Sequence, residues 1–493
     1  MVFSSILFLF YFLPVFIGIY YILPHRLRNI WLLLASICFY AWGAPDFVFI
    51  VLGSIIIDFY LVKNIHSAKR KTKRWLAAIS VVMNVGLLAY FKYANFFIGN
   101  LNDLLNHFGF SQVHWTAIAL PIGISFFTFQ KITYTVDVYR NVHAPLKRLV
   151  DYAMYILMFP HLIAGPIVRF NLVADQIENR RYNETMENRL NGLFRFVIGL
   201  SKKVLIANVL GAEADKVFAM DPATFGAGQA WTGIIAYAFQ IYFDFSGYSD
   251  MAIGLALMIG FNFPENFNNP YISQSITEFW RRWHMTLGRF MREYLYIPLG
   301  GNRVSTARMY LNLWIVFFLS GLWHGAAWNF IAWGAFHGLF LVADRVFLLK
   351  ILQKAGKFPA ILITFFISLI GWVLFRSETL SYAWDFLRAM FSFSGSGLPV
   401  EITMKFAIIM GVAIIFSFFG AIKGVEDWQK KVMRGLREKE TRGQGEEENC
   451  KTQNEKRNMQ NVVLRLSFSL IFLLLCISAI MSTGFNPFIY FRF

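Results

Sequence analysis

The sequence predicts an all-α protein that crosses a membrane many times, and three observations support this fold class. Hydrophobic residues make up 57% of the 493 residues, charged residues only 15%, and the mean hydropathy is +0.50. Soluble domains carry roughly 25% charged residues. Apolar stretches approaching the ~20 residues that cross a bilayer recur along the chain. No large polar domain separates them, so we expect one membrane domain over residues 1–493.

The basic residues indicate where the protein lies. The formal net charge is +17, and it is carried by short loops between apolar stretches, as in loops on the cytoplasmic side of a membrane. This pattern predicts a multi-pass protein of the cell inner membrane, in contact with lipid, and disfavours nucleic acid as a partner. Three scattered cysteines favour neither a disulfide framework nor a metal cluster, and we expect no bound metal.

The first third of the chain predicts five crossings. Residues 1–24 carry no charged side chain and run directly into basic residues 25–28, so we expect an uncleaved first helix with its N-terminus outside. The next four spans are expected at about residues 29–43, 47–62, 75–96 and 115–136. With these spans, the basic segments 63–74 and 140–148 fall on the same side as residues 25–28.

The middle of the chain, residues 150–275, predicts short and interrupted spans. Pro160, Pro166, the pair Lys202-Lys203 and the polar run 244–250 break the apolar pattern. An unsatisfied backbone group inside lipid costs several kcal/mol, so broken helices survive only where protein or a water cavity shelters them. We therefore expect this part of the chain to line a cavity.

The remaining spans follow from charge-free stretches. Residues 309–343 contain no Asp, Glu, Lys or Arg and have basic residues at both ends, which predicts an apolar hairpin. Further spans are expected at about 358–375, 403–421 and 462–484. The charged segment 423–458 predicts a flexible cytoplasmic loop. The total is about eleven transmembrane helices, with additional re-entrant or interfacial helices.

His324 is the leading candidate for chemistry. It lies in the middle of the charge-free hairpin, and fifteen residues of helix after Met309 would carry it about 22 Å into a core roughly 30 Å thick. Ionisable groups inside membranes are functional candidates, although a neutral histidine can simply hydrogen-bond between helices. A buried imidazole suits the transfer of a proton from an acceptor hydroxyl as that hydroxyl attacks a thioester. Trp323 and Asn329, in the same run, are further candidates.

The sequence does not decide the roles of two other histidines, His337 and His284. His337 is thirteen residues further, so we expect it on the returning arm of the hairpin, in a supporting role or in helix packing. His284 follows Trp280 on an expected continuous helix that would place both on one face. It is either an interfacial anchor or a catalytic partner. The neighbouring Arg281 and Arg282 could hold the phosphates of an anionic donor such as coenzyme A.

Tyr242 and Asp244 belong to an otherwise uncharged stretch. An intramembrane carboxylate is expensive, so Asp244 must face a cavity or a partner. The sequence leaves two interpretations open: these residues line a tunnel, or they belong to an internal hydrogen-bond network. Motifs for covalent serine catalysis, nucleotide phosphates, zinc and dinucleotides are absent from the sequence.

Several long motifs resemble the membrane-bound O-acyltransferase family, in particular its alginate O-acetyltransferase branch. The resemblance covers nearly everything before residue 380, with the motifs in family order. The motifs are residues 278–284 (EFWRRWH), 292–303 (REYLYIPLGGNR), 323–325 (WHG), 90–95 (YFKYAN), 121–126 (PIGISF), 160–166 (PHLIAGP) and 242–250 (YFDFSGYSD).

The resemblance implies a ring of helices around a tunnel that joins a cytoplasmic donor to an outer acceptor. It implies that His324 is the catalytic base and that His284 is the second histidine, with a less defined role. It also implies that acetyl-coenzyme A or another acyl thioester is the donor substrate, with no bound cofactor. The acceptor would be an extracytoplasmic polysaccharide such as alginate, reached through an extracytoplasmic partner acetyltransferase.

Two alternatives remain at this stage. A transporter also has broken helices and ionisable residues at the membrane midplane, but it is expected to show two related halves, which this sequence lacks. Relatives that transfer D-alanine from a carrier protein to teichoic acid share the implied fold, and the cytoplasmic arginines would then bind an acidic carrier.

Overall fold

A computed structural model describes residues 1–392, 402–425 and 448–483 of the chain. Helices and their connecting loops make up these residues, and no strand occurs in them, so the all-α prediction is confirmed. The first helices are α1 (Leu13–Ile22), α2 (His25–Gly43), α3 (Val48–Ser67), α4 (Arg70–His107), α5 (Ile124–Tyr139), α6 (Leu149–Leu157), α7 (Phe159–Leu162) and α8 (Phe170–Glu178). A short π-helical segment, Phe8–Phe12, precedes α1.

The second half of the chain follows the same pattern. Its helices are α9 (Met186–Ser201), α10 (Asn208–Phe218), α11 (Ala227–Met258), α12 (Ile276–Arg282), α13 (Met285–Phe290), α14 (Thr306–His324), α15 (Trp328–Ala343), α16 (Leu349–Ala355), α17 (Lys357–Arg376), α18 (Leu380–Met390), α19 (Met404–Phe418) and α21 (Glu448–Thr483). A π-helical segment, Lys202–Ala207, joins α9 to α10.

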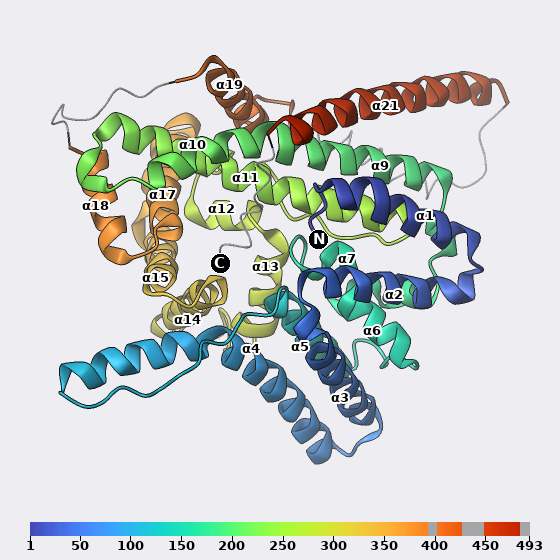
Figure 1. Cartoon of the computed structure of the whole chain (residues 1–493), viewed down its shortest axis with the longest axis horizontal. Helices are drawn as coiled ribbons and strands as arrows, with labels where there is room; N and C mark the ends of the chain where they lie inside the picture. Colours follow the sequence, from blue (N-terminus) through green and yellow to red (C-terminus); the bar gives the residue numbers. More distant parts are fainter. Residues whose placement is uncertain (393–401, 426–447, 484–493) are drawn as a thin grey trace.

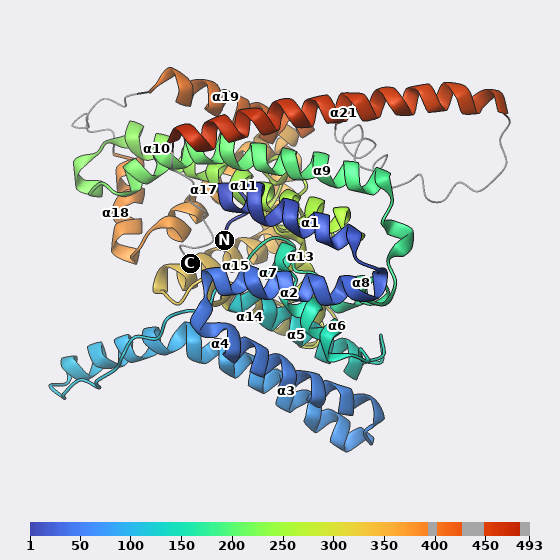
Figure 2. The same cartoon turned by 45° about the vertical axis from the view of Figure 1, so that its right-hand side comes forward.

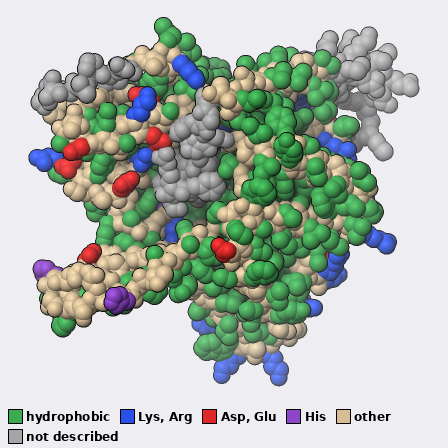
Figure 3. Space-filling view, in the orientation of Figure 1, with side chains coloured by type: hydrophobic (Ala, Val, Ile, Leu, Met, Phe, Trp, Pro, Cys, Tyr) green, Lys and Arg blue, Asp and Glu red, His purple; other side chains and the backbone are tan. Residues whose placement is uncertain are grey.

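The helices surround α11, which packs against α9, α10 and α17. The hairpin of α3 and α4 extends from this body at the bottom of Figure 1, whereas α21 runs along the opposite edge beside α9 (Figures 1 and 2). Hydrophobic side chains cover much of the face in Figure 3, and Lys and Arg gather at the lower tip, where α3 turns into α4. An apolar surface with basic tips is what a membrane protein requires.

Five helical stretches of the described residues are long and apolar enough to cross a membrane. They are Pro45–Ser67, Arg70–His107, Lys357–Arg376, Met404–Ala421 and Val462–Ser482. Five of the predicted spans are thus confirmed to be helices. The expected total of about eleven spans stays a prediction. The charged segment predicted at 423–458 falls largely outside the described residues, as does the tail after residue 483.

Two predictions about where helices begin or break are wrong. The span expected at 115–136 begins as a helix only at Ile124, because Gly123 has a left-handed φ of 78° and its position against the Leu162 carbonyl leaves no room for a Cβ. The polar run 244–250 was expected to interrupt a span, but α11 passes through it unbroken. Lateral ion pairs from Asp244 to Lys203 (2.9 Å) and from Asp250 to Lys202 (2.7 Å) make a break unnecessary.

Glycines allow α9 and α11 to pack with their backbones in contact. A Cβ on Gly199 would lie 2.5 Å from the Gly247 carbonyl oxygen, and a Cβ on Gly254 would lie 2.5 Å from the Gly192 carbonyl oxygen. Association of helices in lipid depends on such close packing of small residues, since lipid tails are as apolar as the helix surfaces. These contacts place α9 directly against the central helix.

We therefore expect Gly247→Ala to destabilise the protein by about 1–3 kcal/mol, because the added methyl group meets backbone that cannot move aside. The measurement is the thermal unfolding midpoint in detergent. Gly86→Ala on α4 is the matched control, since a Cβ there meets nothing within 4 Å. Equal midpoints for the two variants would contradict the packing argument.

Candidate functional site

His324 is the last residue of α14 and lines a cavity of about 180 Å³. Its ring is partly exposed. Residues 120–126, at the start of α5 and in the connection before it, form much of the lining, and the rest comes from Lys92, Ile163 and Trp323. The histidine therefore faces an open space in the protein, as a proton-transfer group must.

Helix α4 holds the end of α14. The last carbonyls of a helix lack intrahelical partners, and here α4 supplies donors for three of them. The Tyr93 hydroxyl donates to the Leu322 carbonyl at 2.8 Å, and the Lys92 ammonium donates to the carbonyls of Trp323 and His324, the latter at 3.1 Å. A cation at a helix C-terminus is also favoured by the helix dipole. Position 324 is thus fixed from a second helix.

The same segment of α4 holds the cavity wall. The Asn95 amide donates to the Ile118 carbonyl at 2.8 Å and accepts from the Ile118 amide at 2.9 Å. The Trp115 indole also donates to Asn95, at 2.9 Å. The 90–95 motif therefore positions both the histidine and the chain that leads into the loop beside it.

We expect Lys92→Met to lower both stability and transfer activity, because it leaves two helix-end carbonyls without their donor. Loss of a partner for a buried polar group costs about 1–3 kcal/mol. Tyr93→Phe, which removes one hydrogen bond, should cost about 0.5–1.5 kcal/mol. Thermal midpoints in detergent test the order, with exposed Lys71→Met as control. A Lys92→Met midpoint equal to that of the control would contradict the positioning role.

Gly325, which follows His324, packs closely against the Phe330 ring. A Cβ there would lie 2.1 Å from the Phe330 ring, so any larger residue would require that ring to move. The His324 ring itself lies among aromatic rings, with centroids 4.8 Å from Trp323, 5.0 Å from Trp333 and 5.1 Å from Phe375. Its nitrogens make no hydrogen bond within the described part of the chain, so they remain available to a substrate.

The expected continuous helix through His284 is wrong. Helix α12 ends at Arg282, and His284 adopts a left-handed φ of 44° before α13 begins. A non-glycine residue in this region is held there by its surroundings and is frequent at functional sites. The side chain of His284 is 1% exposed. The break places the imidazole in the interior, which favours the catalytic-partner interpretation over the interfacial anchor.

Asn266 fixes the tautomer of His284. The Asn266 amide nitrogen donates to the Gly165 carbonyl (3.3 Å) and to Ser249 (3.0 Å), and its oxygen accepts from the Thr286 hydroxyl (2.8 Å). The Gly165 carbonyl can only accept, so the carboxamide cannot be reversed. His284 Nδ1, 3.0 Å from that amide oxygen, must therefore carry a proton. In the neutral imidazole, Nε2 is then the unprotonated acceptor, and it is buried without a hydrogen-bond partner in the described residues.

Trp323 lies next to both of these histidines. Its ring centroid is 4.8 Å from His324 and 6.1 Å from His284. Phe129 stacks on the same indole at 5.3 Å. The structure thus brings together three of the predicted site residues, and two of them present free imidazole nitrogens.

His337 lies on the returning arm, α15, as expected. Its Nδ1 accepts a hydrogen bond from the Trp280 indole at 3.3 Å. Its Nε2 packs so closely against Gly371 that a Cβ there would lie 2.8 Å away. Both nitrogens are therefore enclosed by protein, which favours a role in helix packing.

The remaining candidates lie away from the cavity. Tyr242 packs among aromatic rings, and Asp244 is ion-paired with Lys203, with both side chains 2% exposed. This arrangement favours the internal network over the tunnel lining. Arg282 pairs with Glu278 at 2.8 Å, and Arg281 is exposed. Asn329 ties α15 to the Ser377 carbonyl at 2.7 Å.

Sequence reasoning missed Lys92 and Asn266 as site residues. A lysine inside the apolar span 75–96 was a usable signal, because charges within spans need partners. Asn266 gave no comparable signal, since its contacts depend on the fold. The described residues contain no group of three or more His, Cys, Asp or Glu side chains that could hold a metal ion. The arrangement is suited to proton transfer by imidazole.

Comparison with known proteins agrees with this chemistry. Residues 78–351 match the membrane-bound O-acyltransferase family. The "Probable alginate O-acetylase AlgI" of Pseudomonas aeruginosa is 49% identical over 396 residues, which cover 80% of this chain and 75% of that protein. The "Peptidoglycan O-acetyltransferase" of Helicobacter pylori is 40% identical over 436 residues, covering 81% of each.

A more distant relative is named for a different activity. The "Teichoic acid D-alanyltransferase" of Bacillus subtilis is 28% identical over 281 residues, covering 52% of this chain and 69% of that protein. The family match includes His284 and the helix end at His324. A match to a family of acyltransferases supports the enzyme prediction over the transporter alternative. The chain belongs to the membrane-bound O-acyltransferase family.

Proposed function

We propose that this enzyme moves acetyl groups from a cytoplasmic thioester, acetyl-coenzyme A, to hydroxyl groups of a polysaccharide outside the cytoplasmic membrane. The observation that carries the proposal is His324, whose free imidazole lines a cavity and whose helix end is held by Lys92. The alginate and peptidoglycan O-acetyltransferases among the relatives support acetyl as the group and a polysaccharide as the acceptor class.

In the proposed reaction, His324 is the general base. It accepts the proton of the acceptor hydroxyl while the oxygen attacks the thioester carbonyl, and it then protonates the leaving thiolate. The products are an acetyl ester and free coenzyme A. Lys92 lines the same cavity, and its positive charge would favour the negative charge that develops on the carbonyl oxygen. The neutral imidazole is the form that can accept this proton.

His284 is the proposed second histidine of the site. Its Nε2 can accept a proton because Asn266 engages Nδ1. Its place beside Trp323 suits a second proton-transfer step or the orientation of the donor. The predicted topology places residues 97–114 outside, so the cavity wall at 120–126 lies toward the acceptor side of His324. The donor would then reach the histidines from the cytoplasmic side.

The same proposal implies a cellular location for the protein and a partner enzyme. Basic loops on one side and a cytoplasmic donor favour the inner membrane. The acceptor polymer lies outside, so the hydroxyl acetylated at His324 would belong to an extracytoplasmic partner acetyltransferase, which then transfers the acetyl group to a hydroxyl of the polymer. Arg281, exposed and outside the residues that line the His324 cavity, is a candidate contact for the anionic donor.

Reconstitution tests the proposal directly. Proteoliposomes containing the full chain receive radiolabelled acetyl-coenzyme A on the cytoplasmic face, with an acceptor polysaccharide and its partner acetyltransferase on the other. We expect labelled ester on the polymer and release of coenzyme A. Transfer only from a D-alanyl carrier protein would overturn the acetyl proposal. Chemical analysis of O-acetyl groups on surface polymers of a deletion strain then identifies the acceptor.

A further inference from the structure

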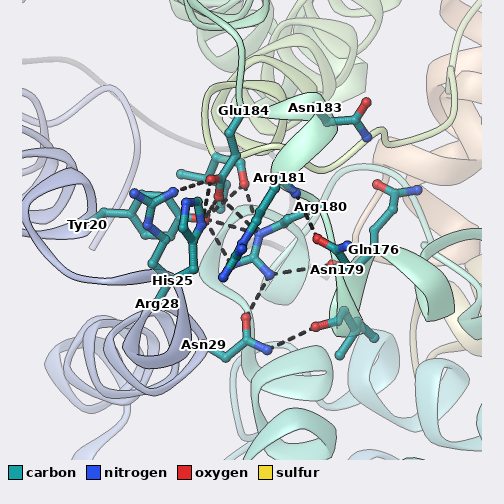
Figure 4. Close-up of polar contacts among 12 residues, drawn as sticks. Tyr20, His25, Arg28, Asn29, Gln176, Asn179, Arg180, Arg181, Asn183 and Glu184 are labelled. Atoms are coloured by element: carbon teal, nitrogen blue, oxygen red, sulfur yellow. Dashed lines mark hydrogen bonds and ion pairs between the residues drawn. The ribbon is translucent and has the colours of Figure 1, made fainter.

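A second cavity, of about 450 Å³, lies at the junction of α1 and α2, and neither His284 nor His324 lines it. The segment that follows α8 forms its other side (Figure 4). Five arginines line it against three carboxylates, Asp151, Glu178 and Glu184. The arginines are Arg26, Arg28, Arg148, Arg180 and Arg181. The cavity therefore has an excess of fixed positive charge.

The inner half of this cavity is internally satisfied. Arg28 and Arg180 both pair with Glu184, and the Tyr20 hydroxyl donates to the same carboxylate at 2.7 Å (Figure 4). Arg180 also donates to Asn29 at 2.7 Å. These contacts join three separate segments of the chain. This half forms a rigid wall with little charge left for a ligand.

The outer half retains its charge. Arg26 and Arg181 are exposed, and their guanidinium groups make no hydrogen bond or ion pair among the residues that the structure describes. Arg148 is 3.8 Å from Asp151, with its side chain 54% exposed. Partial burial and the neighbouring Arg28 lower the pKa of His25. At neutral pH the positive charge therefore comes from the arginines.

Apolar side chains flank the charged mouth. Ile22 is 84% exposed and Leu27 is 43% exposed, on either side of His25 and Arg26. Tyr182 is 60% exposed and Met186 is 66% exposed, just after Arg181. A site for a soluble anion does not require such a border, whereas lipid acyl chains would cover it. By the distribution of basic loops, this end of the protein faces the cytoplasm.

We propose that this cavity binds the phosphate of an anionic phospholipid of the cytoplasmic leaflet, with Arg26, Arg148 and Arg181 around the headgroup. The acyl chains lie over the exposed apolar residues beside it. Guanidinium groups bind phosphate oxygens through paired N–H donors, and basic cavities on the cytoplasmic side of helical membrane proteins suit anionic headgroups. The bound lipid stabilises the α1–α2 junction against the segment after α8.

The test uses the full-length protein, delipidated in neutral detergent and titrated with phosphatidylglycerol, with native mass spectrometry as the readout. We expect the double variant Arg26→Gln/Arg181→Gln to bind this lipid about 30-fold more weakly, since each arginine contributes about 1 kcal/mol near an anionic lipid surface. The matched control is Arg70→Gln/Arg74→Gln, which removes two exposed arginines from the α3–α4 turn. It should bind like the unmodified protein.

Three outcomes overturn the proposal. Equal losses in the two double variants mean general surface attraction. If phosphatidylcholine binds as tightly as phosphatidylglycerol, the cavity does not recognise the negative charge of the lipid. Displacement of phosphatidylglycerol by acetyl-coenzyme A or inorganic phosphate assigns the cavity to a soluble phosphate. The first two outcomes do not bear on acetyl transfer at His324, and the third concerns only where the donor binds, so the two proposals fail separately.

Discussion

Replacing His324 with alanine should lower the rate of acetyl transfer by about 10²- to 10⁴-fold, the range that general acid–base catalysis contributes. The loss should appear in kcat in proteoliposomes supplied with acetyl-coenzyme A, because the imidazole acts on the proton during ester formation. The thermal midpoint should change little, since the His324 ring makes no hydrogen bond within the described residues and borders a cavity.

His337→Gln is the matched control for this prediction. It removes an imidazole from the same hairpin, but one whose nitrogens face the Trp280 indole and Gly371. We expect a lower thermal midpoint with the transfer rate per folded molecule largely kept. A folded His324→Ala enzyme that retains more than about a tenth of its rate would exclude the base role, because proton transfer contributes at least about 10²-fold.

The sequence predicts the membrane fold well where hydrophobicity alone decides the structure. The span at 358–375 contains no charged residue and the span at 47–62 contains only Asp58, and both form helices close to the predicted bounds. The prediction fails where pairing between helices decides. Asp244 and Asp250 looked like a break in a span, but lysines from the neighbouring segment neutralise both and α11 continues.

The candidate site was predictable only in part for the same reason. His324 could be found because it lies in a stretch without any Asp, Glu, Lys or Arg, where a titratable group has few local partners. The turn at His284 could not be found, because its left-handed backbone follows from contacts with Asn266, eighteen residues earlier in the chain. A pattern of periodic hydrophobicity contains no information on such contacts.

The second large effect is expected at His284. We expect His284→Gln to reduce transfer by about 10²-fold, the lower end of the range for a lost proton-transfer group. Asn266→Ala should cause a smaller loss, because the imidazole remains but its tautomer is no longer fixed. It should also lower the thermal midpoint, since the Gly165 carbonyl and the Thr286 hydroxyl lose their partner.

The double variant separates positioning from simple structural damage. If Asn266 acts on catalysis through His284, then adding Asn266→Ala to His284→Gln should lower the rate no further, because residues that act as a unit are not additive. Independent structural damage predicts instead that the two rate losses multiply. Rates are measured per folded molecule, at a temperature well below the midpoint of the double variant. Multiplied losses would leave Asn266 as a packing residue and remove the argument that His284 is held as a proton acceptor.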